Sequence, residues 1–163
     1  MVRSRAVLER LAVASLVATF LLIVVGAYVV MKGAGLACPT WPGCFDDPDT
    51  GVVAHWFPFL DSSLIAKHSY PAASVAAEWI HRFLAGVVTF LVAGTAWMAW
   101  RQKPAERRVR VLATLSGVFL LTQIALGGVT VLGGNEAITV VAHQANAMLV
   151  LACLTALTTL VLV

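Results

Sequence analysis

Four long apolar stretches, separated by shorter polar segments, dominate the pattern of hydrophobic and polar positions along this chain. A helix needs about 20 mostly apolar residues to cross a hydrocarbon core of ~30 Å, and each stretch reaches that length. The sequence therefore predicts an all-α membrane protein whose 163 residues form a single four-helix transmembrane bundle. The predicted helices cover residues 8–30, 75–100, 109–132 and 138–163.

The first stretch follows Arg3, Arg5 and Arg10, an arrangement that a secretory signal peptide shares. Its apolar run is longer than the ~7 to 15 residues of a signal core, and no clear cleavage site follows. We therefore expect a transmembrane helix here.

Charged residues are few and gather between the apolar stretches. The composition is 60% hydrophobic and 12% charged, and the mean hydropathy of +0.90 lies outside the soluble range. Basic residues precede the first helix and fill the turn between the second and third, so the positive-inside rule places both segments in the cytoplasm. We expect a multi-pass protein of a prokaryotic plasma membrane with both termini inside. The positive-inside rule then accounts for the net charge of +3, which does not indicate nucleic-acid binding.

One connection, residues 31–74, is much longer than the others and is expected to be extracytoplasmic. Its mixture of aromatic, aliphatic and polar residues suits a short helix that lies on the outer membrane surface or covers the bundle. A partly ordered solvent loop is the alternative. His55 and His68 of this loop show no ligand spacing, and the sequence assigns them no role.

Two cysteines of the same loop, Cys38 and Cys44, bracket the segment Pro39-Thr40-Trp41-Pro42-Gly43. Disulfides persist on the outward side of a prokaryotic membrane, so a bridge is expected. A metal-binding pair is the alternative.

Two histidines stand inside predicted helices, His81 in the second and His143 in the fourth. Each lies about six residues from the predicted outer helix end, or ~9 Å at 1.5 Å per residue. One such histidine would be read as the hydrogen-bond partner of a nearby hydroxyl. Two at one depth in separate helices of a bundle are what a six-coordinate haem iron requires.

Small and polar residues surround the predicted histidine level. Gln123 and Gly127 share one face of the third helix with Thr130 and Gly134. They would make room for a macrocycle and help to orient it. Ordinary small-residue packing between membrane helices is the alternative.

Glu78 and Arg82 flank His81 on the second helix. Glu78 precedes the histidine by three residues and shares its helix face, and an intramembrane carboxylate is costly unless a partner or a function retains it. It is therefore a candidate proton donor or acceptor beside a haem, and Arg82 is a candidate ligand of a haem propionate. Alternatively, the two side chains pair with each other and anchor the helix end.

These residues together resemble the haem A synthase family. The run Gly33-Ala34-Gly35-Leu36-Ala37-Cys38-Pro39-Thr40-Trp41-Pro42-Gly43-Cys44 is similar to the segment after that family's first helix. Glu78-x-x-His81-Arg82 resembles its second-helix signature, Gln123 to Gly134 its third helix, and His143 stands where its fourth helix has a histidine.

The resemblance implies oxidation of the ring methyl of haem O to a formyl group, which gives haem A. Successive hydroxylation with loss of water from a geminal diol is the mechanism expected for the family. The resemblance assigns the axial iron ligands to His81 and His143, the catalytic carboxylate to Glu78, and an outward disulfide to Cys38 with Cys44.

The familiar members have eight helices in two similar halves, one of which holds a haem b, whereas this chain resembles the glutamate-bearing half alone. We therefore expect copies to associate, with a dimer favoured and a trimer left open. Haem O synthase and oxidase-assembly proteins are further candidate partners, besides membrane lipid.

Three other functions compete with this interpretation. A quinone-linked disulfide-forming enzyme needs two cysteine pairs, whereas the loop holds one pair and Cys153 stands in a helix. A di-haem electron carrier needs four intramembrane histidines. A non-catalytic haem-binding, electron-transfer or oxidase-assembly protein remains the serious alternative, because only Glu78 argues against it.

Overall fold

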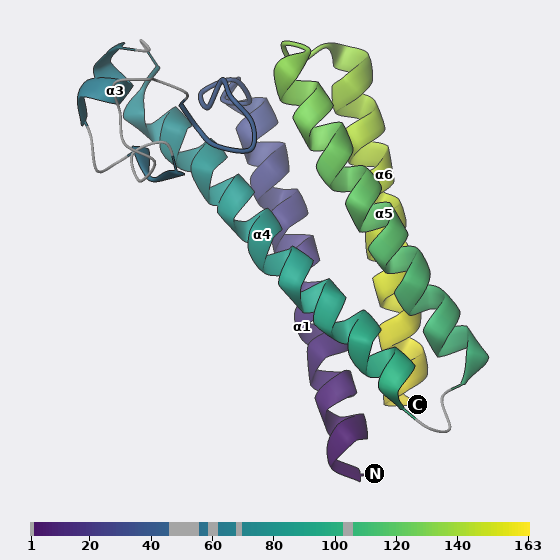
Figure 1. The fold of residues 1–163 in the computed structure, drawn as a ribbon. Helices are drawn as coiled ribbons and strands as arrows, with labels where there is room; N and C mark the ends of the chain where they lie inside the picture. Colours follow the sequence, from purple (N-terminus) through teal and green to yellow (C-terminus); the bar gives the residue numbers. More distant parts are fainter. Residues whose placement is uncertain (1, 46–55, 59–61, 68–69, 103–105) are drawn as a thin grey trace.

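The computed structural model describes residues 2–45, 56–58, 62–67, 70–102 and 106–163. Four long helices account for most of them: α1 (Val2–Met31), α4 (Ala72–Arg101), α5 (Arg107–Leu132) and α6 (Ala137–Leu162) (Figure 1). Each is long and apolar enough to cross a membrane, and no strand occurs in the described ranges. The prediction of an all-α, four-helix membrane bundle is confirmed.

The helix ends differ from the predicted ones mainly at the N-terminus of the chain. α1 begins at Val2 and not near residue 8, and the other boundaries lie within three residues of those predicted. The extra residues of α1 include the polar Arg3, Ser4 and Arg5, and Arg5 Nε lies 3.0 Å from Glu9 Oε1 one turn on. Hydropathy alone ends a predicted helix where the apolar run ends, although the backbone remains helical beyond it.

The long connection between α1 and α4 is described only in part. It contains α3, a six-residue helix from Ser62 to Lys67, which corresponds to the expected short helix. Its position on a membrane surface stays a prediction. His55 and His68 lie outside the described residues.

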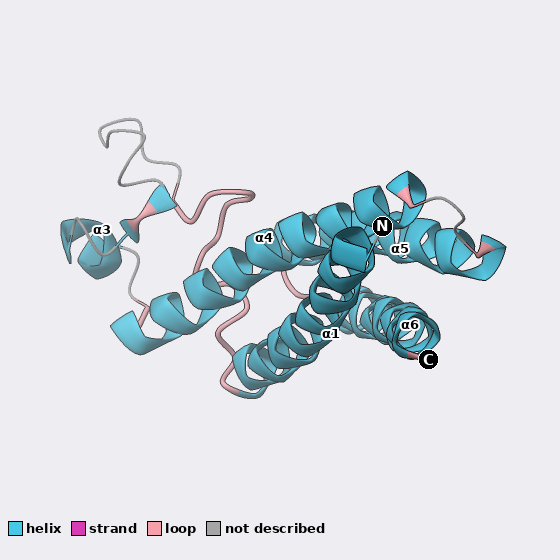
Figure 2. Cartoon of the chain, turned by 90° about the horizontal axis from the view of Figure 1, so that it is seen from below, coloured by secondary structure: helices cyan, strands magenta, loops and turns pink. Residues whose placement is uncertain are grey.

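The four long helices form two close pairs. α1 packs mainly against α4, and α5 mainly against α6, while α1 also contacts α6 and α4 also contacts α5. Figure 2 shows the bundle from below, with α6 seen nearly end-on, α1 oblique, and α4 and α5 running across the view. Towards the end where α1 stops and α4 starts, here called the loop end, α4 leans away from α5 and α6 (Figure 1).

The main core fills the half of the bundle that lies away from the loop end. Its aliphatic side chains come from all four long helices, and a buried hydroxyl pair, Ser15 with Thr95 at 2.9 Å, lies among them. The buried members are Leu8, Ala12, Val88, Val92, Ala99, Val109, Ala113, Leu120, Val150, Leu154, Leu157 and Val161.

A second, smaller core lies under the loop that follows α1. It consists of Ala37, Cys38, Cys44, Phe45 and Val75, all nearly inaccessible to solvent. This cluster attaches the loop to the first turn of α4. The remaining space between the two cores is where the polar residues of α4, α5 and α6 gather.

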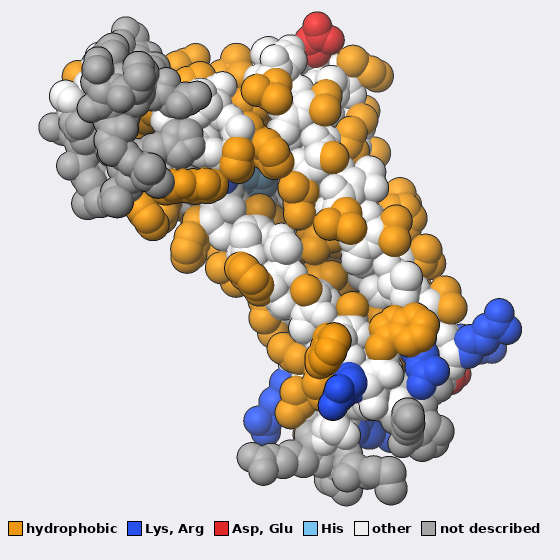
Figure 3. Space-filling view, in the orientation of Figure 1, with side chains coloured by type: hydrophobic (Ala, Val, Ile, Leu, Met, Phe, Trp, Pro, Cys, Tyr) orange, Lys and Arg blue, Asp and Glu red, His pale blue; other side chains and the backbone are white. Residues whose placement is uncertain are grey.

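The surface agrees with a membrane-spanning bundle. Apolar side chains cover the helices along most of their length, and basic side chains gather at one end (Figure 3). That end carries Arg101, Arg107, Arg108 and Arg110 and is called here the arginine-rich end. The guanidiniums of Arg101 and Arg110 each lie 5.5 Å from the ring centroid of a tryptophan, Trp97 and Trp100 respectively. Such belts of indole and guanidinium groups are typical of a membrane interface.

Candidate functional site

His81 projects from α4 onto α1, where a glycine makes room for its ring. A Cβ added at Gly26 would lie only 2.8 Å from Cε1 of the imidazole and 3.3 Å from Nδ1. No larger residue fits at position 26 unless the ring moves. The His81 ring can therefore lie against α1 because Gly26 has no side chain.

His143 has the same relation to the other helix pair. It projects from α6 onto α5, where a Cβ added at Gly127 would lie 3.2 Å from its Cε1. Each histidine thus rests on a glycine of the helix that packs most closely against its own. The two helix pairs supply one imidazole each, in matching surroundings.

The two histidines lie at different residue counts from the starts of their helices. α4 begins at Ala72, so His81 stands nine residues into its helix, while His143 stands six residues into α6. The sequence predicted that both histidines lie six residues from the outer ends of their helices. The structure differs for His81, because α4 starts about a turn earlier than predicted. The extra turn belongs to the part of α4 that leans away from α5 and α6 (Figure 1).

Gln123 of α5 lies beside His143. Its Nε2 lies 3.2 Å from Nε2 of His143, and its Oε1 accepts a hydrogen bond of 2.7 Å from Asn146 Nδ2. The Nδ1 atoms of both histidines are buried and have no hydrogen-bond partner within the described part of the chain. Of the sequence-predicted site residues, the structure thus brings together His143, Gln123 and Gly127, while His81 lies against Gly26 of the other helix pair.

Glu78 lies one turn from His81 on α4 and is almost fully buried, with 3% of its surface exposed. Its Oε2 accepts a hydrogen bond of 2.7 Å from the main-chain N–H of Cys38, and its Oε1 lies 2.5 Å from Nη2 of Arg82. The carboxylate therefore faces two donors, a pattern that suits its anionic form.

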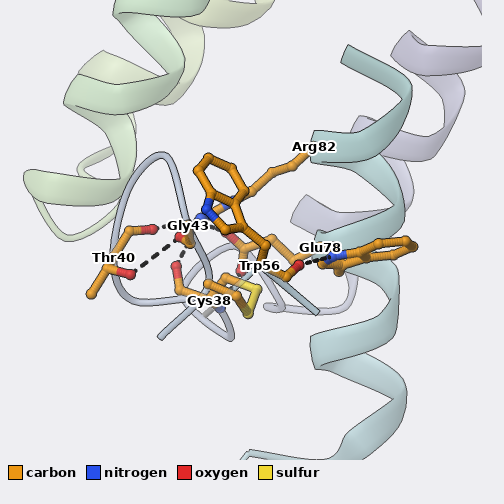
Figure 4. Close-up of a disulfide and its surroundings, with 8 residues drawn as sticks. Cys38, Thr40, Gly43, Trp56, Glu78 and Arg82 are labelled. Atoms are coloured by element: carbon orange, nitrogen blue, oxygen red, sulfur yellow. Dashed lines mark hydrogen bonds and ion pairs between the residues drawn. A yellow bond between two sulfur atoms is a disulfide. The ribbon is translucent and has the colours of Figure 1, made fainter. Parts of the chain in front are cut away.

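Arg82 holds the loop that follows α1. Its Nη1 donates to the carbonyls of Thr40 and Gly43, and its Nη2 donates to the carbonyl of Cys38 and to Glu78 (Figure 4). The pairing with Glu78 that the sequence left as an alternative is therefore present. Its partners in the loop are main-chain carbonyls, which no side-chain pattern in the sequence could reveal.

The Cys38–Cys44 disulfide closes this loop, with 4.2 Å between the two Cα atoms. The structure therefore contains the bridge that the sequence led us to expect. Trp41, inside the loop, packs over Gly128 of α5, where an added Cβ would lie 3.2 Å from the indole. Trp79 of α4 donates its indole N–H to the carbonyl of Trp56 at 2.7 Å (Figure 4). The connection between α1 and α4 thus contacts both helix pairs.

The donor set limits what such a site can bind. Among the described residues, no group of three or more His, Cys, Asp or Glu side chains is arranged to hold a metal ion. Two imidazoles are too few to hold a bare ion, but they complete the coordination of an iron that already has four equatorial nitrogens. Some histidine surface is visible between the two helix pairs near the loop end (Figure 3).

A groove of about 620 Å³ between α5 and α6 lies elsewhere, at the arginine-rich end. It is lined by Arg107, Arg108 and Thr159 together with aliphatic residues. Thr159 follows His143 by 16 residues, or ~24 Å along a helix. The groove therefore takes no part in the histidine site.

Comparison with known proteins identifies the family. A family model described as "Cytochrome oxidase assembly protein" (COX15-CtaA) matches residues 48–155. The heme A synthase of Bacillus pumilus (strain SAFR-032) is 32% identical over 134 residues, which cover 79% of this chain and 38% of that protein. The heme A synthase of Bacillus licheniformis is 30% identical over 155 residues, covering 94% of this chain and 45% of that protein.

A relative of another name also matches. The protoheme IX farnesyltransferase of Halobacterium salinarum (strain ATCC 29341 / DSM 671 / R1) is 30% identical over 124 residues, which cover 76% of this chain and 23% of that protein. The chain spans less than half the length of these curated relatives. No solved structure matches significantly. Because the family model covers well over half of the chain, this four-helix membrane protein belongs to the COX15-CtaA family of cytochrome oxidase assembly proteins.

Proposed function

We propose that this protein binds haem between His81 and His143 and takes part in haem A synthesis by oxidising the ring methyl of haem O to a formyl group. The observation that carries the proposal is the pair of imidazoles from separate helix pairs, each set against a glycine of the neighbouring helix. The relatives named heme A synthase supply the reaction class.

The residues present fit a haem. Both Nδ1 atoms are buried without a partner, and both rings lie in cradles that a single added methyl group would fill. His81 and His143 would be the two protein ligands of the haem iron. Haem O is the proposed substrate and haem A the product, and haem b is a further candidate for the same site. The haem iron would supply the oxidising chemistry when bound.

The protein's own side chains would orient the macrocycle and manage charge around it. His81 and His143 would hold the iron, and Gly127 would leave room beside it. Glu78 would be the catalytic carboxylate, which stabilises positive charge or accepts a proton at the reacting carbon. Its position one turn from His81, away from bulk water, supports that role.

The membrane orientation belongs to the same proposal. The arginine-rich end would face the cytoplasm, with both termini, and the loop end would face outward. The disulfide at the loop end supports this orientation, because disulfides persist outside the cytoplasm. The haem would then lie nearer the outer side of the plasma membrane.

Association of copies is the further part of the proposal. The relatives are more than twice as long as the part that this chain matches, so a neighbouring bundle would supply the equivalent of their remaining length. A symmetric dimer is the favoured form, and a trimer is the other outcome that mass measurement in detergent would reveal. Haem O synthase and oxidase-assembly proteins are the proposed hetero-partners.

One observation favours a second candidate function, that of a non-catalytic haem-binding or electron-transfer protein of oxidase assembly. Both oxygens of Glu78 are engaged in anchoring the loop, through Cys38 and Arg82. A carboxylate with this structural task would be retained even without catalysis.

Analysis of extracted haems separates the two functions. The protein is produced in cells that supply haem O, and the haems are extracted and resolved by chromatography. We expect hydroxylated and formyl products with the wild type, and bound but unconverted haem with Glu78→Gln, which keeps an oxygen to accept from Cys38. Glu136→Gln, at an exposed carboxylate of the loop end, is the matched control and should convert normally. Bound haem without product in the wild type would leave only the non-catalytic function.

A further inference from the structure

A hydrogen bond joins the histidine of α6 to the amide of Gln123 on α5, nitrogen to nitrogen. The distance from Gln123 Nε2 to His143 Nε2 is 3.2 Å. One of two bonded nitrogens has to donate and the other has to accept. A carboxamide nitrogen carries two hydrogens and no available lone pair, so it donates. Nε2 of His143 therefore has to present its lone pair.

This assignment depends on which end of the Gln123 carboxamide faces the histidine, and Asn146 decides it. Nδ2 of Asn146 lies 2.9 Å from the main-chain carbonyl oxygen of Phe119 and 2.7 Å from Oε1 of Gln123. A carbonyl oxygen only accepts, so the Asn146 atom that faces Phe119 has to be the amide nitrogen. The same nitrogen also donates to Gln123, so the atom of Gln123 that faces Asn146 has to be the accepting oxygen, Oε1. The amide nitrogen of Gln123 is then left for His143.

We propose that Asn146 is a positioning residue for His143. Through Gln123, it holds the ring as the tautomer with hydrogen on Nδ1, and it holds the Nε2 lone pair towards the amide of Gln123. The amide N–H of Gln123 donates to that lone pair, and a metal that binds Nε2 would take the place of this hydrogen bond. Asn146 itself is 8% exposed and lies one turn along α6 from the histidine, which suits a supporting role.

The surroundings of Nδ1 do not favour the opposite tautomer. Nδ1 of His143 has no partner among the described residues, so it is left unsatisfied whether it carries the hydrogen or a lone pair. The hydrogen bond at Nε2 therefore decides the equilibrium. In the opposite tautomer, two N–H groups would point at each other across 3.2 Å.

The part of this inference that concerns iron rests on the proposed function. An imidazole binds iron through an unprotonated nitrogen, and second-layer hydrogen bonds commonly fix the tautomer of a ligating histidine. Here the tautomer would already be correct before haem arrives. Binding would then exchange one partner of Nε2 for another without a ring flip or proton transfer. The Gln123 amide would turn away while its oxygen stays bonded to Asn146.

Nitrogen NMR of the haem-free protein in detergent tests the tautomer without any variant. The chain has four histidines, and His143→Gln identifies the signals of His143 by their loss. We expect a protonated Nδ1 and an unprotonated Nε2 in the wild type. A wild-type His143 that carries its hydrogen on Nε2 would overturn the proposal, whatever the protein does with haem.

Two variants should reverse the tautomer. In Asn146→Asp the new carboxylate only accepts, so Gln123 would donate to it and turn its oxygen to His143, which would then donate from Nε2. In Gln123→Glu the carboxylate would accept from both Asn146 and His143, with the same result. Gln144→Glu, an exposed amide on the same helix, is the control and should leave the His143 signals unchanged. If either folded variant keeps an unprotonated Nε2, the relay through Asn146 is wrong.

Haem titration of the same variants completes the test. Because haem binding would have to break the hydrogen bond from Nε2–H of His143 to Gln123 and move the proton off Nε2, apparent haem affinity should fall roughly tenfold in Asn146→Asp. It should stay within twofold of the wild type in Gln144→Glu. Unchanged affinity with a reversed tautomer would overturn the positioning role. A wild type that binds no haem would instead contradict the proposed function, while the tautomer result would stand.

Discussion

The imidazole of His81 lies on Gly26 so closely that a Cβ at position 26 would come within 2.8 Å of its Cε1. This contact joins α4 to α1, the helix that packs most closely against it. The position of a proposed iron ligand therefore depends on the absence of a side chain on another helix. Glycine at position 26 is required by this close approach and not by backbone conformation.

Gly26→Ala tests this dependence directly. The new methyl group would push the His81 ring out of its cradle, so we expect haem binding to fall at least tenfold, or by about 1.4 kcal/mol. Optical titration with haem measures the change. Gly86→Ala is the matched control, because a Cβ there would meet nothing within 4 Å. It should bind haem normally and gain roughly 0.5–1 kcal/mol of stability from the better helix former. Equal haem binding by Gly26→Ala and Gly86→Ala would show that Gly26 does not position the His81 ring.

Gly127→Ala should act in the same direction with a smaller effect. Its Cβ would lie 3.2 Å from Cε1 of His143, so a shift of a few tenths of an ångström would relieve the contact. We expect haem affinity to fall by about threefold, or ~0.6 kcal/mol. Gly117→Ala on the same helix, with open space around its Cβ, should leave the titration unchanged. A larger loss of haem affinity in Gly127→Ala than in Gly26→Ala would show that the distance from the added Cβ to the imidazole does not determine the effect.

Arg82→Gln should loosen the disulfide loop and destabilise the protein. The substitution removes three bonds to loop carbonyls and leaves the buried Glu78 carboxylate without its ion-pair partner. Breaking such a pair costs about 3 kcal/mol, so the thermal midpoint should fall clearly. Hydrogen exchange of the amides from Cys38 to Cys44 should also accelerate.

Arg5→Gln is the control for that experiment. Its partner Glu9 and Arg5 itself are largely solvated, with side-chain exposures of 32% and 61%. An exposed pair one turn apart contributes less than ~1 kcal/mol, and loop exchange should not change. If Arg82→Gln behaves like Arg5→Gln, Arg82 does not anchor the loop.

The double variant Cys38→Ser, Cys44→Ser should be less stable by about 2 kcal/mol, because a short covalent loop restricts the unfolded chain. The loop should nevertheless stay attached, since Arg82 and Glu78 hold it through main-chain groups that the substitution keeps. Thermal unfolding and haem titration measure the two effects separately. Loss of haem binding together with full unfolding of the loop would mean that the disulfide, and not Arg82, holds the site together.

The sequence predicted the parts of this protein that side-chain identity encodes. Apolar runs of membrane-spanning length predicted α1, α4, α5 and α6, and two intramembrane histidines predicted which helices the candidate site would join. The Cys38–Cys44 spacing and the outward loop led to the expected disulfide. The roles of the site residues stay predictions.

Other features could not be read from the sequence. The partners of Arg82 are carbonyls of Cys38, Thr40 and Gly43, and every residue has such a carbonyl. The direction of the Gln123 amide depends on a carbonyl of α5 for the same reason. The equal depth of the two histidines in residue count was lost because α4 extends a turn beyond its apolar run.

The most direct test of the two-histidine site is a reduced-minus-oxidised absorption spectrum of the purified protein after reconstitution with haem. We predict the sharp bands of a six-coordinate, low-spin haem in the wild type, their loss in His81→Ala and in His143→Ala, and their retention in Gly86→Ala. A wild type without haem bands, or histidine variants with unchanged bands, would contradict the account.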